Sequence, residues 1–405
     1  MRRQAPTLRP IHPFPARMAP ELAVARLKRL PAGSTVLDPM AGSGTVVRQA
    51  LEFGHQAMGF DLDPLAVLMS RVWTMPVEDS VIEKLAAMVL GEAKALNPEV
   101  VGLPWIDDDS ETTEFVKFWF GDQQRNDLRR LALILWHLDQ PQVKGQERSA
   151  TDVLRVALSR LIIVKENGAS LARDVSHSRP HKVTQQSAFE VFPAFERSVK
   201  HVRKRLLEAP PRPGATVALG DARLMKDIAS SEIDAVMTSP PYLNAIDYMR
   251  GHRLSLVWLG HKLSDLRQIR TSSVGAERAP DHKGAAYHFK EIADQIVCSN
   301  DIAPRNGSMV LRYAEDLYRI MSEIVRVLKS TGKAIFVIGN SCLQGIFIRN
   351  SAGVIKAASM VGLRLVHQME RELPHASRYL PMPRRSNEPL GKRMRTETVL
   401  TFRPV

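Results

Sequence analysis

The sequence of 405 residues predicts an α/β fold around a mostly parallel sheet, with a mainly helical insertion. Two βα units follow one another near the N-terminus. Each combines a short apolar run, a turn and a helical pattern, over residues 34–54 and then 55–73. Helical periodicity without a clear strand extends over residues 79–210. This insertion divides the sheet-forming sequence into residues 1–78 and 211–405.

The second part of the predicted core contains the remaining strands. These are short apolar runs over residues 215–219, 234–237, 333–340, 363–374 and 396–404. The last two are expected to pair antiparallel. An amphipathic helix over residues 314–332 is predicted to stop at Gly332. Residues 246–310 are polar and mixed, and they predict a long excursion rather than packed core.

Composition limits the class of protein and its compartment. The apolar fraction of 44% allows a sizeable core. There is no apolar run of the roughly 18 residues that a membrane-spanning helix needs, and the first ten residues lack an apolar signal core. Only Cys298 and Cys342 are present, which argues against a disulfide framework or a cysteine-rich zinc site. We expect a cytoplasmic, nucleoid-associated protein without a membrane partner.

The net charge of +13 favours a polyanionic partner, chiefly nucleic acid. Charge alone leaves DNA, RNA and an acidic membrane comparable. Arg197, Lys200 and Lys204 fall on one helical stripe with no acid to balance it, which favours phosphate contact over a solvated face. Basic residues also cluster over 383–395.

The stretch "VLDPMAGSGT" places Asp38 at a strand end and two glycines, Gly42 and Gly44, in the turn before a helix. Small residues let the backbone approach a ligand closely, and the helix N-terminus favours a negative group such as a carboxylate. The dinucleotide fingerprint is excluded because its third glycine is missing and Asp-Pro precedes the turn.

The next strand ends in "GFDLDP" and carries Asp61. An acid at this place can accept hydrogen bonds from both ribose hydroxyls of a nucleoside. By itself Asp61 would be read as a helix cap. With Asp38 and the glycines it indicates an adenosine-containing ligand without pyrophosphate. S-adenosylmethionine fits, with its amino-acid end at the glycine turn and its ribose at the acid.

The stretch "VMTSPPY", residues 236–242, ends a strand with two prolines. The result is a stiff loop that carries one hydroxyl, a fixed backbone and an aromatic ring. In open α/β sheets ligands bind at the carboxyl ends of the strands, where this loop lies. A surface turn is the ordinary explanation of an isolated Pro-Pro.

"DPMAGSGT" followed downstream by "TSPPY" resembles the paired signatures of S-adenosylmethionine-dependent DNA amino-methyltransferases of the N4-cytosine or N6-adenine type. The resemblance covers residues 10–78 and 214–403. It implies a class I methyltransferase fold, a Rossmann-like sheet of seven strands with one antiparallel strand near the end. The implied cofactor is S-adenosylmethionine, and the implied cofactor-binding residues are Phe14, Asp38, Pro39, Ala41, Gly42, Ser43, Gly44, Thr45, Asp61, Asp221 and Ala222.

Two of these assignments have ordinary alternatives. In the family, the segment that resembles "HPFPARMAPEL", with Phe14, lies over the methionine end of the cofactor. As bare sequence it is equally a proline-rich leader. Asp221 matches the position that contacts the adenine amino group, although Gly-Asp alone reads as a turn.

The resemblance implies that Ser239, Pro240, Pro241 and Tyr242 form the catalytic loop. An exocyclic base nitrogen is a poor nucleophile because its lone pair is delocalised into the ring. The Ser239 hydroxyl and the Pro240 carbonyl would accept its hydrogens and direct the lone pair at the methyl group. The Tyr242 ring would stack on a base flipped out of the duplex. A cysteine nucleophile is not required, so methylation at C5 of cytosine is not expected.

The first residue of the catalytic motif bears on the substrate. Within the family a serine there is associated with N4 of cytosine, and asparagine or aspartate more with N6 of adenine. Ser239 therefore predicts N4 methylation of cytosine in double-stranded DNA, with a restriction or defence-system partner left open. Three alternatives remain: N6 methylation of adenine, an RNA methyltransferase such as a tRNA guanine-N2 enzyme, and a non-catalytic nucleic-acid-binding protein with this fold.

Basic residues outside the core motifs are the expected DNA contacts. They are Arg173, Arg179, Arg197, Lys200, Lys204, Arg384, Arg385, Lys392 and Arg393. A solvated, charged loop is an even alternative for those between the last two strands. Asp247 and Tyr248 are read either as base-pocket residues or as structural ones. No metal is expected, because His177 and His181 have no cysteine or acidic cluster beside them.

Overall fold

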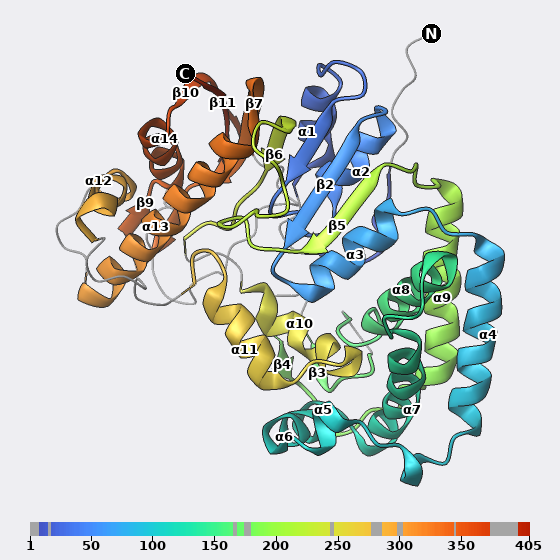
Figure 1. Cartoon of the computed structure of the whole chain (residues 1–405). Coiled ribbons are helices and arrows are strands. Elements are labelled where there is room, and N and C mark those ends of the chain that lie inside the picture. Colours follow the sequence, from blue (N-terminus) through green and yellow to red (C-terminus); the bar gives the residue numbers. More distant parts are fainter. Residues whose placement is uncertain are drawn as a thin grey trace.

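The computed structural model describes residues 8–14, 18–164, 168–173, 180–243, 247–276, 286–297, 303–343, 346–372 and 396–405. A twisted sheet forms one part of the molecule, and a group of helices forms the other (Figure 1). The helices of the insertion lie beside α3 (Pro64–Thr74), which belongs to the sheet part.

The sheet has seven strands in the order β10-β11-β7-β6-β1-β2-β5. Their bounds are Thr35–Asp38 for β1, Gln56–Asp61 for β2, Ala215–Leu219 for β5, Ile233–Thr238 for β6, Leu328–Gly339 for β7, Leu363–Glu372 for β10 and Thr396–Pro404 for β11. All pairings are parallel except those of β11 with β7 and β10. This topology confirms the predicted class I, Rossmann-like methyltransferase sheet with one antiparallel strand near the end.

Helices cover both faces of the sheet. Because successive residues of a strand point to opposite sides, neighbouring residues pack against different helices. Val36 packs in a cluster with α1 and α2, whereas its neighbour Leu37 packs in a cluster with α12, α13 and α14. Met237 and Val236 divide in the same way. The helices concerned are α1 Pro20–Leu27, α2 Thr45–Glu52 and α3 Pro64–Thr74, then α12 Ala286–Ile296, α13 Pro304–Val327 and α14 Asn350–Met360.

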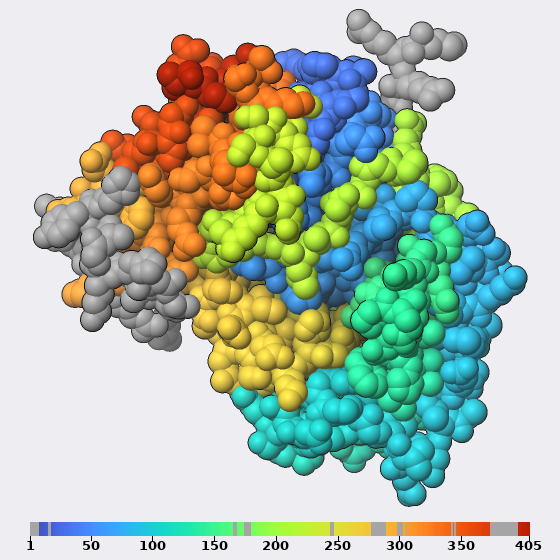
Figure 2. Space-filling view, in the orientation of Figure 1, coloured from blue at the N-terminus to red at the C-terminus, as the bar shows by residue number. Residues whose placement is uncertain are grey.

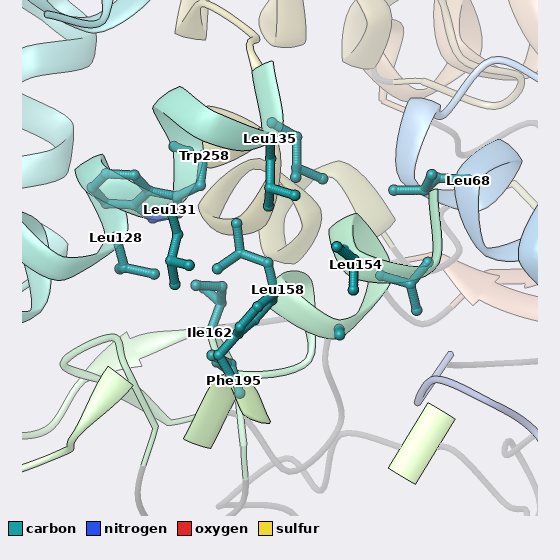
Figure 3. Packing of buried hydrophobic residues seen from close by; sticks show 14 of the residues in the cluster. Leu68, Leu128, Leu131, Leu135, Leu154, Leu158, Ile162, Phe195 and Trp258 are labelled. Atoms are coloured by element: carbon teal, nitrogen blue, oxygen red, sulfur yellow. The ribbon is translucent and has the colours of Figure 1, made fainter. Parts of the chain in front are cut away.

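The insertion is a helical layer with its own core (Figure 3). It consists of α4 Asp79–Ala95, η1 Pro98–Val100, α5 Pro104–Asp107, α6 Ser110–Trp119, α7 Asp122–Leu138, α8 Gly145–Ser159 and α9 Val191–Glu208. Leu131, Leu158 and Phe195 pack there together with Leu68 of α3, so the same apolar cluster joins the insertion to the sheet part. The sequence showed no strand in this region, but the structure has a short pair, β3 Ala172–Arg173 and β4 His181–Lys182.

The prediction of a polar excursion over residues 246–310 is wrong for the described part of that range. Residues there form α10 Tyr248–Leu256, η2 Val257–Leu259, α11 Leu263–Ser272, α12 and the start of α13. Trp258 is fully buried against the insertion. In α11 only Leu263 and Leu266 are buried. The polar composition therefore belongs to the exposed faces of packed amphipathic helices.

The helix predicted to stop at Gly332 ends five residues earlier, at Val327, and β7 begins at once. Residues 329–332 are left out of the pairing with β6, which steps from Leu328 to Lys333. A Cβ at Gly332 would lie 2.8 Å from the Leu328 side chain. The glycine thus serves a bulge in the strand rather than the end of the helix. A further short hairpin joins β8 Ser341–Leu343 to β9 Ile346–Ile348.

Candidate active site

The turn between β1 and α2 needs both of its glycines. Gly42 and Gly44 have φ angles of 51° and 84°, in the left-handed region that favours glycine. A Cβ at Gly44 would overlap the side chain of Ser70 and lie 3.1 Å from the Ser70 Cα. A Cβ at Gly42 would lie 3.1 Å from the Phe14 ring. The backbone of this turn is therefore held in a close, preformed arch.

Asp61 closes this arch from the end of β2. Its carboxylate accepts hydrogen bonds from the Gly42 N–H at 2.8 Å and from the Asp63 N–H at 3.0 Å. Burial, followed by the charge of Asp63, raises the pKa of Asp61 to about 6. The helix cap that Asp61 alone would suggest is instead Asp63, which accepts from the Leu65 N–H at 2.9 Å. Asp61 is left to face the glycine turn.

Asp38 links the glycine turn to the loop after β6. Its buried carboxylate accepts hydrogen bonds from the Thr238 hydroxyl at 2.8 Å and from the Met40 N–H at 3.2 Å. Burial raises the pKa of Asp38 to about 7. The two hydrogen bonds oppose this rise, and the charge of Asp61 adds to it. The two predicted motifs, far apart in sequence, thus meet at the carboxyl ends of adjacent strands.

The Ser-Pro-Pro-Tyr loop is anchored to the helices on the other face of the sheet. The Tyr313 hydroxyl of α13 donates to the Pro241 carbonyl at 3.1 Å. Asn350 of α14 accepts from the Leu243 N–H at 3.3 Å, and the Ser341 hydroxyl donates to the Leu243 carbonyl at 2.9 Å. These three anchors were missed in the sequence, since no local pattern marks them.

Tyr242 lies within this loop and packs against the core beneath α12, α13 and α14. Burial raises the pKa of Tyr242 well above its ordinary value, while hydrogen bonds with the Ser239 side chain and the Gly339 backbone act in the opposite direction. The hydroxyl is therefore neutral at physiological pH and interacts with the predicted catalytic serine.

Phe14 lies over the glycine turn, where a Cβ at Gly42 would be 3.1 Å from its ring. Its ring stacks on Tyr248 of α10 with centroids 5.2 Å apart and lies 5.6 Å from His252. His252 in turn pairs with Asp63. The segment before Phe14 is packed rather than a loose leader, because Ile11 is buried. Tyr248 thus belongs to the aromatic cover of the turn.

Asp221 follows β5 and lies close to Asp61, since the Gly220 N–H donates to the Asp61 carbonyl at 3.1 Å. Both carboxylate oxygens of Asp221 accept from Arg223, which also pairs with the buried Asp316 at 2.6 Å. Burial alone would raise the pKa of Asp221, but the Arg223 hydrogen bonds hold it below its ordinary value. An adenine amino group at Asp221 would share the carboxylate with Arg223. The neighbouring Ala222 is buried.

Four of the nine predicted DNA contacts lie in the described part of the chain, three of them on α9. Arg197, Lys200 and Lys204 are exposed on α9, which packs on α4 and α8. The expectation that no acid balances this stripe is wrong for Lys200, which pairs with Glu196 at 2.6 Å. Arg173 donates to the backbone carbonyl of its neighbour Ala172. The other predicted contacts, Arg179, Arg384, Arg385, Lys392 and Arg393, lie outside the described residues.

A cavity of about 340 Å³ lies between α3, the end of β5 and the helices α7, α8 and η2. Its walls combine apolar and charged side chains: Pro64, Val67, Leu68, Arg71, Trp136, Asp139, Arg148, Arg155, Leu219, Leu256, Leu259, Gly260 and His261. None of the predicted cofactor or catalytic residues lines this cavity.

In the described part of the chain, no group of three or more histidine, cysteine, aspartate or glutamate side chains could hold a metal ion. Among the same residues, no helix is both long and apolar enough to cross a membrane.

Comparison with known proteins gives distant relatives. No protein-family model matches the chain. The type II methyltransferase M.MvaI of Kocuria varians is 20% identical over 90% of this chain and 84% of its own length. M.BsoBI of Geobacillus stearothermophilus, also a type II methyltransferase, is 23% identical over 82% of this chain and 73% of its own length. Both of these distant relatives are type II methyltransferases, and the base that this chain would methylate stays a prediction.

Among solved structures, the chain is similar to a TehB-like SAM-dependent methyltransferase from Corynebacterium glutamicum. That match covers 95% of this chain and 88% of the other, with 10% identity and a TM-score of 0.30.

Proposed function

We propose that this chain transfers a methyl group from S-adenosylmethionine to the exocyclic N4 of cytosine in double-stranded DNA. The observation that carries the proposal is the Thr238–Asp38 hydrogen bond. It holds the Ser-Pro-Pro-Tyr loop beside the glycine turn, so a base amino group and a methyl donor would meet between two rigid strand ends. The distant type II methyltransferase relatives support DNA as the substrate.

S-adenosylmethionine is the methyl donor, and the residues of the turn fit it. The buried hydroxyls of Ser43 and Thr45, at the start of α2, have no hydrogen-bond partner within the described residues. Together with the helix N-terminus they suit the carboxylate of an amino acid. The buried Asp38 and Asp61 have raised pKa values, so positive charge beside them is favourable. When bound, the cofactor supplies an electrophilic methyl group.

The catalytic loop would prepare the amino group of the base. The Ser239 hydroxyl and the Pro240 carbonyl accept its hydrogens, and Tyr242 provides a ring beside them. With its lone pair directed by these acceptors, the base nitrogen would take the methyl group that the bound cofactor would supply and would release one of its hydrogens as a proton. Because the loop is anchored at Thr238, Pro241 and Leu243, its acceptors hold their directions without reorganising.

The choice of N4 of cytosine rests on Ser239, the first residue of the motif. The insertion, α4 to α9, would contribute to target recognition. It packs directly on α3 and so has a fixed position relative to the glycine turn.

Product analysis tests this proposal. The full chain is expressed in a methylation-free host, and the host DNA is digested to nucleosides for mass spectrometry. We expect N4-methylcytosine, and none from the Ser239→Ala variant. Detection of N6-methyladenine instead would show that the target base is adenine. Methylation found only in RNA would show that the substrate is RNA rather than DNA. Failure to bind S-adenosylmethionine in calorimetry would indicate a non-catalytic nucleic-acid-binding protein.

A further inference from the structure

Four arginines form a patch on the two helices that follow the catalytic loop. Arg250 and Arg253 lie on α10, and Arg267 and Arg270 lie on α11. The side chains of Arg267 and Arg270 are 56% and 47% exposed. The four are close enough to affect one another: burial and then the charges of the other three lower the pKa of Arg253. We call these four residues the arginine patch.

The counter-charges of the patch are fewer than its positive charges. Asp247 is shared between Arg270 at 2.7 Å and Arg250 at 3.5 Å, and Glu111 pairs with Arg267. Within the described residues, Asp247 and Glu111 thus pair with three of the four guanidinium groups, and Asp109 is near enough to Arg267 for that charge to help lower the Asp109 pKa. Exposed ion pairs of this kind contribute little to stability, so their arginines can exchange a carboxylate for another anion at small cost. The planar guanidinium fork matches the oxygens of a phosphate.

The position of the patch connects it to the proposed chemistry. Helix α10 begins directly after the loop that carries Ser239 and Tyr242. The same helix reaches the glycine turn, because Tyr248 stacks on Phe14 and His252 pairs with Asp63. Figure 2 shows the yellow surface of these helices exposed between the loops after β5 and β6 and the helices α5 and α6. Backbone phosphates bound there would flank a base held in the loop.

We infer that the arginine patch binds the phosphate backbone of double-stranded DNA beside the target base. This inference rests on the proposed function, but it places the contact on α10 and α11 rather than on the α9 stripe or the basic residues of the sequence prediction. Asp247, which pairs with two arginines of the patch, and Tyr248, which covers the glycine turn, are neighbours at the start of α10. DNA binding would therefore be coupled to the aromatic cover of the glycine turn.

The test uses the full chain and the double variant Arg267→Gln/Arg270→Gln, with Arg212→Gln as the matched control. Arg212 is 49% exposed and has an ion pair with Glu52. It lies just before the edge strand β5, at the amino ends of the parallel strands, whereas the catalytic loop follows the central strand β6 at their carboxyl ends. Fluorescence anisotropy measures binding to a labelled DNA duplex of mixed sequence at several salt concentrations. No recognition sequence is needed, because phosphate binding is independent of sequence.

We expect the slope of log affinity against log salt to become shallower by about two for the double variant. Raising the salt from about 50 to 200 mM should then weaken DNA binding by a factor that is about tenfold smaller for the double variant than for the unchanged chain. Arg212→Gln should retain the original slope. S-adenosylmethionine binding, measured by calorimetry, should be the same in all three proteins.

Three results would overturn the inference: an unchanged slope in the double variant, an equal change in Arg212→Gln, or, when a labelled RNA duplex is measured in the same way, a loss seen with RNA while DNA binding stays intact. Failure of the proposed function looks different. In that case no methylated cytosine forms in the host DNA, although the double variant still loses its DNA contacts.

Discussion

The hydroxyl of Thr238, the last residue of β6, donates a hydrogen bond of 2.8 Å to the buried carboxylate of Asp38, the last residue of β1. Both groups are almost fully buried, with exposures of 0% and 3%. A buried carboxylate that loses a donor becomes costly, so this contact fixes the spacing between the glycine turn and the catalytic loop.

Replacing Thr238 by valine should test that spacing. Valine keeps the shape of threonine but leaves the Asp38 carboxylate without its side-chain donor. We expect the free energy of unfolding to fall by about 1–3 kcal/mol and methyl transfer to slow. Urea unfolding and single-turnover rates measure the two effects. Thr238→Ser, which keeps the hydroxyl, is the control. Equal stability and activity in the valine variant would refute this role of the hydrogen bond.

The raised pKa values of Asp38 and Asp61 predict the pH dependence of cofactor binding. The values lie near 7 and near 6, against an ordinary 3.8, mainly because both groups are buried. Ionised carboxylates attract a cationic ligand, so S-adenosylmethionine should bind more tightly as the pH rises from about 5.5 to 7.5. Below the pKa, affinity should fall about tenfold per pH unit for each carboxylate that must be ionised. Calorimetry at several pH values measures this.

The stability of the ligand-free chain should depend on pH in the opposite direction to cofactor affinity. With raised pKa values, the folded chain binds more protons than the unfolded chain between about pH 4 and 7. The contribution of Asp38 and Asp61 to the free energy of unfolding therefore falls as the pH rises through that window. In Asp61→Asn the lower step of the binding profile should be lost. A flat binding profile in the unchanged chain would contradict the assignment of these carboxylates.

The sequence predicts the sheet and the motifs because their chemistry is contiguous. A strand, its last acidic residue and the following turn occupy one short stretch, so Asp38, Gly42 and Asp61 can be read directly. Tyr313 and Asn350 could not be read in this way. Their side chains reach Pro241 and Leu243 only through the packing of α13 and α14, more than 70 residues further along the chain.

The composition of the segment after the catalytic loop gives a wrong prediction for a related reason. Helix α11 buries only two of its ten residues, so its average composition is that of a polar loop. The arginine patch was missed with it, because α10 and α11 bring together arginines that are up to 20 residues apart in sequence. The periodicity of Leu263 and Leu266 is the local signal that could have identified this helix.

Asn350 should be required for the position of the catalytic loop. Its fully buried side chain accepts from the Leu243 N–H and donates to the Gly339 carbonyl at 3.0 Å. Asn350→Ala leaves these backbone groups without partners, at about 1–3 kcal/mol each. We expect a lower free energy of unfolding and slower methyl transfer, with cofactor affinity nearly unchanged because Asn350 lies on the far side of the loop.

A neighbouring serine provides the comparison for Asn350. Ser351→Ala removes a hydrogen bond to Asn340 at 3.1 Å without touching Leu243. It should leave the rate of methyl transfer unchanged. If Asn350→Ala weakened cofactor binding as much as it slowed transfer, the side chain would support the whole site rather than the loop.

Gly44→Ala should abolish cofactor binding. Two effects contribute, backbone strain and a steric overlap with Ser70, and a comparison with Gly54→Ala separates them. The φ angle of 84° makes any side chain strained at Gly44, at about 1–2 kcal/mol, and the new Cβ would also meet Ser70 of α3. Gly54 has a φ angle of 77° but nothing within 4 Å of a Cβ. Gly54→Ala should therefore lose only the stability due to strain, and it should bind S-adenosylmethionine normally in calorimetry. Because a Cβ at Gly44 would overlap Ser70, the start of α2 would have to shift, so Gly44→Ala should show a larger loss of stability and no measurable binding. Normal binding by Gly44→Ala would exclude the glycine turn as the cofactor site.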